Sequence, residues 1–185
     1  MKKVVRLLTS VLVVVLFLSF IKLDNAKAAE YSLKEGDVFV TTSTVAIGVT
    51  GHAGIVIKDK TKGLIILHFP KPGSPISTIT LSQWKTSYPN TEVYRTTSTD
   101  TAQKAARWAY ANYEIGSKPT YSFALDLSST SKSYCSKIVW QGYYYGANKA
   151  IKKPWSNLAT PYSLALSANY NVSISKVAKY GRGLQ

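Results

Sequence analysis

Short apolar runs separated by polar or Gly/Pro-rich turns make up the chain between residues 31 and 95. β-branched and aromatic residues are enriched in these runs, which predict strands at 37–41, 53–57, 64–69 and 91–95. The polar segment between the second and third runs ends in Gly63, which predicts a β-hairpin. Later in the chain, alternation over 170–177 predicts a last strand.

Helical spacing appears in two later stretches. Ser98 is expected to cap a helix that runs through Tyr113, with its alanines on one face. A second helix is expected to begin beside Cys135, after a cap at Ser133, and to reach about Gly146. Strands and helices are segregated along the chain rather than alternating. This arrangement favours an α+β fold in which an antiparallel sheet packs against helices.

The N-terminal residues 1–28 have the pattern of a secretory signal peptide. Three basic residues precede an apolar run at 11–20, and Ala26-Lys27-Ala28 forms a small-x-small cleavage site. We expect cleavage after Ala28, which leaves one domain at 29–185, secreted or held at the cell envelope with no stable membrane span. A retained N-terminal anchor is the alternative.

Basic residues outnumber acidic ones strongly. The whole chain has a net charge of +14, and the predicted mature chain has +10, because the signal segment contains five basic residues and one acidic residue. This charge favours attraction to anionic cell-wall polymers. Nothing in the sequence resembles a nucleic-acid-binding motif, so we predict no nucleic-acid partner.

Cys135 is the one cysteine of the chain and cannot form an internal disulfide. After export such a thiol is buried, paired with another chain or reactive. Its place at a predicted helix start favours reactivity, because unpaired backbone N–H groups and the helix dipole stabilise a thiolate there. We therefore expect a nucleophilic Cys135 whose pKa lies below that of a free thiol.

The two histidines of the chain lie at the open end of the predicted hairpin. His52 opens the first strand and His68 closes the second, so we expect the two imidazoles to be neighbours. One can serve as the base for Cys135 and the other can orient that base, as in cysteine hydrolases. Each histidine could instead be a strand-end residue without a chemical role. The spacing matches no zinc motif, and we expect neither a metal nor a cofactor.

Three segments carry a family resemblance. They are Gly36-Asp37-Val38-Phe39, the stretch Gly51-His52-Ala53-Gly54-Ile55-Val56-Ile57, and Tyr134-Cys135-Ser136-Lys137-Ile138-Val139. Together they resemble the circularly permuted papain-like amidases of the YaeF/YiiX type, which are related to NlpC. The resemblance implies a permuted papain-like fold with the nucleophile at a helix N-terminus. It also implies Cys135 as nucleophile, His52 as base and His68 as the third polar residue.

The sequence departs from the family pattern at two positions, and neither departure removes a catalytic group. His68 stands where some relatives carry a carboxylate, although the NlpC and lecithin:retinol acyltransferase relatives often use histidine there. Lys137 stands where relatives commonly have Glu, and we interpret it from the helix phase as a surface or substrate contact that points away from Cys135.

These features predict a secreted cysteine hydrolase, an amidase or peptidase that cleaves amide bonds in cell-wall peptides such as peptidoglycan stem peptides. One alternative is an acyl-lipid hydrolase or acyltransferase on the same fold, which predicts a long apolar groove. Another is a non-catalytic cell-wall-binding protein, which loss of Cys135 or His52 would have favoured.

Overall fold

The computed structural model describes residues 31–43, 51–116 and 118–184. The predicted signal peptide lies outside these residues and stays a prediction. All described helices and strands belong to one compact unit, Ser32–Gln185.

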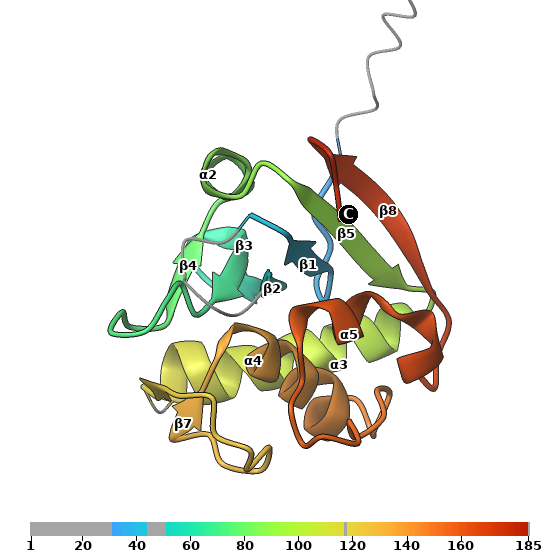
Figure 1. Cartoon of the computed structure of the whole chain (residues 1–185). Coiled ribbons are helices and arrows are strands. Elements are labelled where there is room, and N and C mark those ends of the chain that lie inside the picture. The colour runs from blue at the N-terminus through green and yellow to red at the C-terminus, as the bar shows by residue number, and fades with distance from the viewer. Residues whose placement is uncertain (1–30, 44–50, 117, 185) are drawn as a thin grey trace, which may run out of the picture. The chain divides into compact units, whose positions relative to one another are not determined.

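One six-stranded antiparallel sheet forms the framework, in the order β4-β3-β2-β1-β5-β8 (Figure 1). Its strands are β1 (Val38–Thr41), β2 (His52–Asp59), β3 (Gly63–His68), β4 (Ser77–Ile79), β5 (Thr91–Thr96) and β8 (Ile174–Tyr180). The predicted hairpin is confirmed as β2 and β3. The last strand begins at Ile174 rather than Tyr170, because Tyr170 forms an isolated bridge with Ile151 instead.

Seven helical segments accompany the sheet in the described part of the chain. They are α2 (Leu81–Ser87), α3 (Thr99–Ala109), η1 (Tyr110–Gly116), α4 (Cys135–Gln141), η2 (Gly142–Gly146), α5 (Pro161–Ala165) and η3 (Ser167–Asn169). Ser98 caps α3 as predicted, accepting a hydrogen bond from the N–H of Thr101. The helix that starts at Cys135 continues through η2 to Gly146, which also confirms the expected end.

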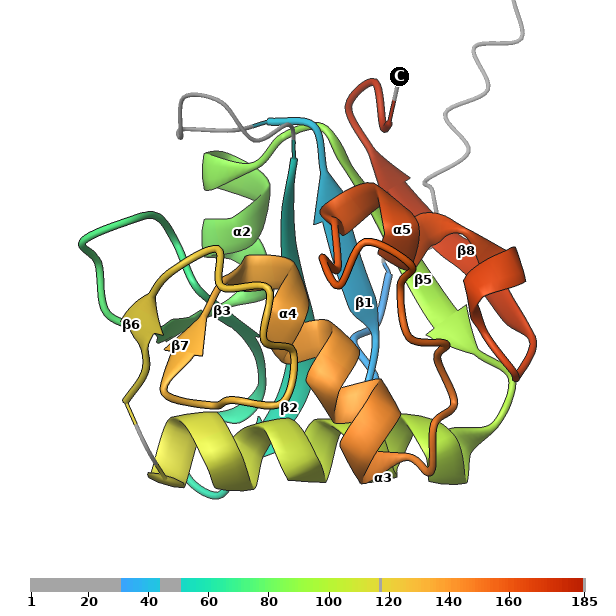
Figure 2. The same cartoon turned by 60° about the horizontal axis from the view of Figure 1, so that its bottom comes forward.

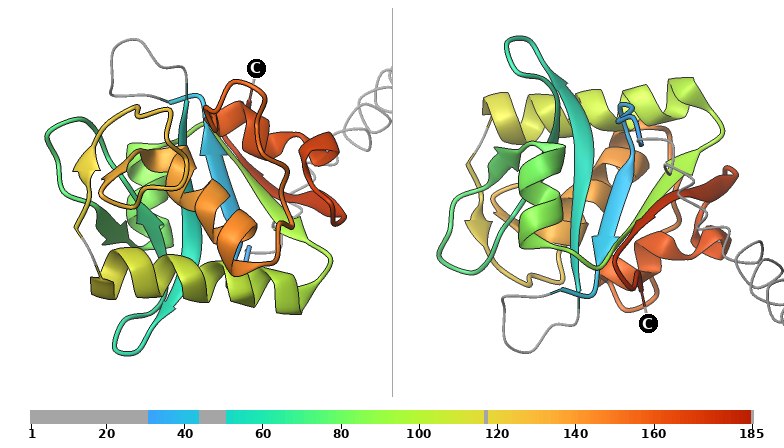
Figure 3. Two further views of the ribbon diagram at one scale, coloured as in Figure 1. Left: turned by 90° about the horizontal axis from the view of Figure 1, so that it is seen from below. Right: turned by 90° about the horizontal axis from the view of Figure 1, so that it is seen from above.

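Helices cover both faces of the sheet, and Figure 3 shows these layers from below and from above. On one face, the alanines of α3 and the apolar residues of α4 meet inward-facing side chains of β1, β2 and β3, among them Val40, Ala53 and Leu67. On the other face, α2 places Trp84 against Phe39 with 5.3 Å between ring centroids. The central strand β2 is therefore buried on both sides, which explains its continuous apolar sequence.

The start of α4 differs from the prediction. The cap residue is Tyr134, which has an extended backbone and makes no side-chain capping hydrogen bond. Ser133 lies in β7 (Lys132–Ser133), a short strand that pairs in parallel with β6 (Thr120–Tyr121). Because that pairing holds Ser133 in extended backbone, the helix begins after Tyr134. Cys135 nevertheless remains in its first turn.

Lys137 is not the surface residue that the helix phase indicated. Its side chain is fully buried, and its Nζ donates hydrogen bonds to the carbonyl oxygens of Asp126 and Lys132 at 2.5 and 2.7 Å. The β6–β7 connection folds over this side of α4 (Figure 2). As a result, every residue of α4 is buried, and Lys137 anchors that connection instead of facing solvent or substrate.

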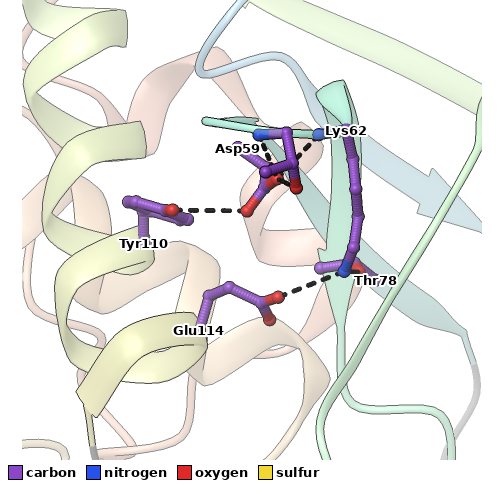
Figure 4. Close-up of polar contacts among 6 residues, drawn as sticks. Asp59, Lys62, Thr78, Tyr110 and Glu114 are labelled. Atoms are coloured by element: carbon purple, nitrogen blue, oxygen red, sulfur yellow. Dashed lines mark hydrogen bonds and ion pairs between the residues drawn. The ribbon is translucent and has the colours of Figure 1, made fainter.

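The turn of the β2–β3 hairpin is held by a polar cluster against η1 (Figure 4). Oδ1 of Asp59 accepts hydrogen bonds from the backbone N–H groups of Thr61 and Lys62, and its Oδ2 accepts one from the Tyr110 hydroxyl. Lys62 also forms an ion pair with Glu114 at 3.5 Å. These contacts fix the end of the hairpin that lies away from the two histidines.

Candidate active site

The open end of the hairpin brings the two histidines into direct contact. His68 pairs with Gly54 across the ladder, so it is the diagonal neighbour of His52 on the same face of the sheet. His52 Nε2 lies 2.9 Å from His68 Nδ1, and His68 Nε2 lies 3.3 Å from the hydroxyl of Ser77 on β4. When each Nε2 donates its proton along this chain, Nδ1 of His52 keeps an unshared electron pair. That tautomer is the one a base needs.

Aromatic rings from α2 and from its C-cap residue enclose His52. Tyr88 and Trp84 both stack on its imidazole, with centroid distances of 4.7 and 5.5 Å. Gly54 makes room for this packing, since a Cβ there would come within 2.9 Å of the Trp84 ring and 2.7 Å of Ile66. Sequence reasoning missed both Tyr88 and Ser77. The available signal for Tyr88 was its position four residues after Trp84, a spacing that places two side chains on one face of a helix.

Burial sets the protonation of the histidines. It lowers the pKa of His52 well below its ordinary value, and the neighbouring charge of His68 lowers it further. Burial also lowers the pKa of His68 to about 4. Near neutral pH both rings are therefore uncharged, which suits His52 as a proton acceptor.

Cys135 is buried at the start of α4, with its sulfur among backbone donors. The N–H groups of Ala53, Ser136 and Cys135 itself point at Sγ and favour a thiolate, but burial outweighs them and raises the pKa of the Cys135 thiol. The expectation that the pKa of Cys135 lies below that of a free thiol is therefore wrong. The helix start supplies the donors that were predicted, yet the apolar surroundings exclude the water that would solvate a charge.

Cys135 and His52 line one cavity of about 280 Å³. Its other walls are mainly apolar and aromatic, and they include Tyr88, Tyr121, Phe123, Leu125, Leu158 and Pro161. Figure 2 shows the β6–β7 connection and the segment before α5 on either side of the start of α4, and both contribute to these walls. His68 lies behind His52 rather than in the cavity wall.

The structure thus brings all three predicted site residues together. His52 and His68 are joined by a hydrogen bond, and His52 and Cys135 share the cavity. A thiol, a neutral imidazole and a hydrogen-bonded orienting group are the components of thiol-based acyl transfer. The N–H of Cys135 lies in the first helical turn, where it can donate to an oxyanion.

A solved structure with a similar fold is the metalloprotein yiiX of Escherichia coli O157:H7. It matches with a TM-score of 0.56 and 15% identity, over 80% of this chain and 98% of the other. This likeness confirms the α+β, permuted papain-like fold class. The described residues of this chain contain no group of three or more His, Cys, Asp or Glu side chains that could hold a metal ion. His52 Nε2 and His68 Nδ1 bond to each other, so these two nitrogens are not free to act as metal ligands.

Two further comparisons concern the sequence. An uncharacterized 30.3 kDa protein of Bacillus thuringiensis is 31% identical over 160 residues. The match covers 79% of this chain and 58% of the relative, so the chain spans somewhat more than half of that protein. The model of the family described as lipoprotein N-acylation protein LnsA-like matches residues 2–178. The chain therefore belongs to the LnsA-like lipoprotein N-acylation protein family.

Proposed function

We propose that this protein is a cysteine acyltransferase that takes an acyl chain from a lipid onto Cys135 and passes it to an amine. The observation that carries the proposal is the apolar cavity that contains both Cys135 and His52. An acyl chain matches such walls, whereas a peptidoglycan stem peptide would leave its polar groups without partners there. The family description supports the same substrate class. The acyl-lipid alternative is thus favoured over the cell-wall amidase.

The first half-reaction moves the acyl group to the enzyme. Cys135 Sγ attacks the ester carbonyl of the lipid while His52 Nδ1 accepts the thiol proton. The carbon–oxygen ester bond then breaks, and His52 returns that proton to the departing lipid alkoxide. The products are a thioester on Cys135 and a lyso-lipid alcohol.

The second half-reaction regenerates the enzyme. An amine attacks the thioester carbonyl and loses a proton to His52 as the carbon–nitrogen bond forms. The carbon–sulfur bond breaks, and the proton on His52 returns to the leaving sulfur. The products are an amide and the free Cys135 thiol, and water in place of the amine would give a fatty acid instead.

The resting site is neutral on this account. Burial raises the pKa of Cys135 and lowers that of His52, so the uncharged thiol–imidazole pair is favoured before substrate binds. The proton therefore moves as the new carbon–sulfur bond forms. The negative charge then passes to the carbonyl oxygen, where the N–H of Cys135 can stabilise it. His68 and Ser77 hold His52 in the tautomer that this transfer requires.

We also propose that the enzyme works at the cell envelope after export. The predicted signal peptide and the lipid-linked family description support this location. Among the described residues, none forms a helix long and apolar enough to cross a membrane.

The test is a transfer assay on the exported protein. It supplies a phospholipid as donor and a lipopeptide with a free amino terminus as acceptor, with peptidoglycan fragments in a parallel reaction. We expect the lipopeptide to gain one acyl group, a lyso-lipid to appear in equal amount, and Cys135→Ala to abolish both products. Cleavage of peptidoglycan fragments without acyl transfer would instead support the amidase.

A further inference from the structure

Large apolar side chains of the Cys135 cavity wall and of its surroundings are exposed to solvent. Phe123 and Leu125 line that cavity, yet 41% and 63% of their surfaces are accessible to solvent. Trp155 is fully exposed and lines an adjoining hollow, which shares Leu158 and Thr160 with the cavity. These residues come from the β6–β7 connection and the segment before α5, which flank the start of α4 in Figure 2. The exposed apolar groups are therefore contiguous with the lining of the cavity.

Basic side chains border the same surface. Lys152 and Lys153 are exposed and line the hollow that contains Trp155. Lys153 also lines a second hollow, together with Leu125 and Asp126. Among the residues that line these two hollows, Asp126 is acidic while Lys152 and Lys153 are basic, so the border has a net positive charge. We call Phe123, Leu125, Lys152, Lys153 and Trp155 the rim surface.

We propose that the rim surface docks on an anionic lipid bilayer. A tryptophan flanked by lysines suits the boundary between headgroups and acyl chains, because the indole enters the apolar layer while the ammonium groups stay at the phosphates. An anionic wall polymer could pair with the lysines, but it offers no apolar phase for Trp155 or Leu125. The observed combination of charge and apolar exposure therefore favours a membrane.

Docking would connect the membrane directly to the site. Phe123 and Leu125 belong both to the rim surface and to the cavity wall, so an acyl chain could pass from the bilayer to Cys135 along apolar contacts. The role that docking would have, delivery of lipid to Cys135, rests on the proposed acyl-lipid function. The binding itself is measured without turnover, so the two can fail separately.

The test compares single variants of the exported protein by sedimentation with vesicles. The vesicles contain phosphatidylcholine alone or phosphatidylcholine with phosphatidylglycerol. Trp155→Ser should weaken binding to both by at least about tenfold, because it removes the inserted apolar surface. Lys153→Ala should weaken binding by about fivefold on the anionic vesicles only.

Matched controls lie at the other end of the hairpin. Ile115 on η1 is 64% exposed, and Lys60 is exposed in the β2–β3 turn. Ile115→Ser and Lys60→Ala should bind vesicles like the unchanged protein. If the control variants lost as much vesicle binding as the rim variants, the proposal would be overturned. It would also be overturned if the rim variants lost binding to isolated cell walls but bound vesicles like the unchanged protein.

A second measurement is independent of any anchoring by the N-terminal segment. Lipids with brominated acyl chains should quench part of the tryptophan emission of the unchanged protein, and Trp155→Phe should lack that part. Trp84 and Trp140 are buried, and Trp108 is half-buried, so Trp155 is the residue best placed for quenching. Equal quenching in both proteins would contradict insertion of Trp155.

Turnover of a dissolved substrate separates docking from catalysis. Trp155 does not line the Cys135 cavity, so Trp155→Ser should process a short-chain ester below its micelle concentration as the unchanged protein does. Its turnover of vesicle lipid should fall in parallel with its binding. Normal vesicle binding by a protein with no acyl-transfer activity would reject the proposed function while leaving the docking surface intact.

Discussion

The two ends of the β2–β3 hairpin have opposite effects on the charged forms of their titratable side chains. At the turn, backbone N–H groups and the Tyr110 hydroxyl lower the pKa of Asp59, so the fold favours the charged carboxylate. At the open end, burial lowers the pKa of His52 and His68, so the fold disfavours the charged imidazoles. The same direction of shift thus means stabilised charge at one end and suppressed charge at the other.

This difference separates a structural region from a chemical one. The Asp59 carboxylate has its partners in place and closes the turn, which is a contribution to folding. The buried histidine pair lowers stability whenever the medium would protonate it, and such a cost is typical of functional sites. At neutral pH, variants at the open end should therefore change mainly turnover, while variants at the turn should change mainly stability.

The largest expected effect is on turnover at the open end. His52→Ala should lower the rate of acyl transfer by about 10³-fold, because it removes the group that accepts the thiol proton. Asp59→Ala, at the turn, should leave that rate within about twofold. The measurement is the initial rate of lyso-lipid release by each variant. A rate loss in Asp59→Ala comparable to that in His52→Ala would remove the distinction between the two ends.

The buried histidines should also make stability depend on pH. The pKa of His68 is about 4 in the folded protein and about 6.5 when unfolded, so the unfolded chain binds the proton more readily. Stability should be full above pH 6.5 and should fall by about 3 kcal/mol as the pH drops toward 4. Denaturant titrations at several pH values measure this change. His68→Asn should reduce the dependence and leave the part that comes from the buried His52, and an unchanged slope would mean that His68 is not a source of it.

His68→Ala should impair catalysis less than His52→Ala does. The variant keeps the base but loses its hydrogen-bonded orienting partner, so we expect a rate loss of about 10- to 100-fold. His68→Gln retains a side chain able to accept the proton of His52 Nε2 and should recover part of the loss. The test is the acyl-transfer rate of both variants. Full activity of His68→Ala would exclude His68 from the site.

The smallest expected effect belongs to the turn. Asp59→Ala removes hydrogen bonds to Thr61, Lys62 and Tyr110, and we expect it to lower the Tm by a few degrees. Tyr110→Phe deletes one of these bonds and should have a smaller effect. Thermal unfolding of both variants at neutral pH provides the measurement. A Tm unchanged by Asp59→Ala would mean that the turn cluster contributes nothing to folding.

Local patterns predicted the hairpin, the helix after Cys135 and the meeting of His52 with His68. The features that sequence patterns did not predict depend on contacts between segments that are distant in the chain. The burial of Lys137 depends on the β6–β7 connection, and the raised pKa of Cys135 depends on surroundings that no helical pattern encodes. Tyr88 reaches the site through the packing of α2 on the sheet. The roles of Cys135, His52 and His68 stay predictions until they are measured.

Acylation of Cys135 can be measured directly as the mass of the intact exported protein after brief incubation with a phospholipid donor and no amine acceptor. We expect a gain of one acyl group that maps to the peptide containing Cys135 and is released by neutral hydroxylamine, as a thioester would be. His52→Ala should acquire this adduct far more slowly, Asp59→Ala should acquire it normally, and Cys135→Ala should not acquire it at all. Lipid turnover that persists in Cys135→Ala, or that proceeds without any adduct on Cys135, would show that Cys135 does not carry the acyl group.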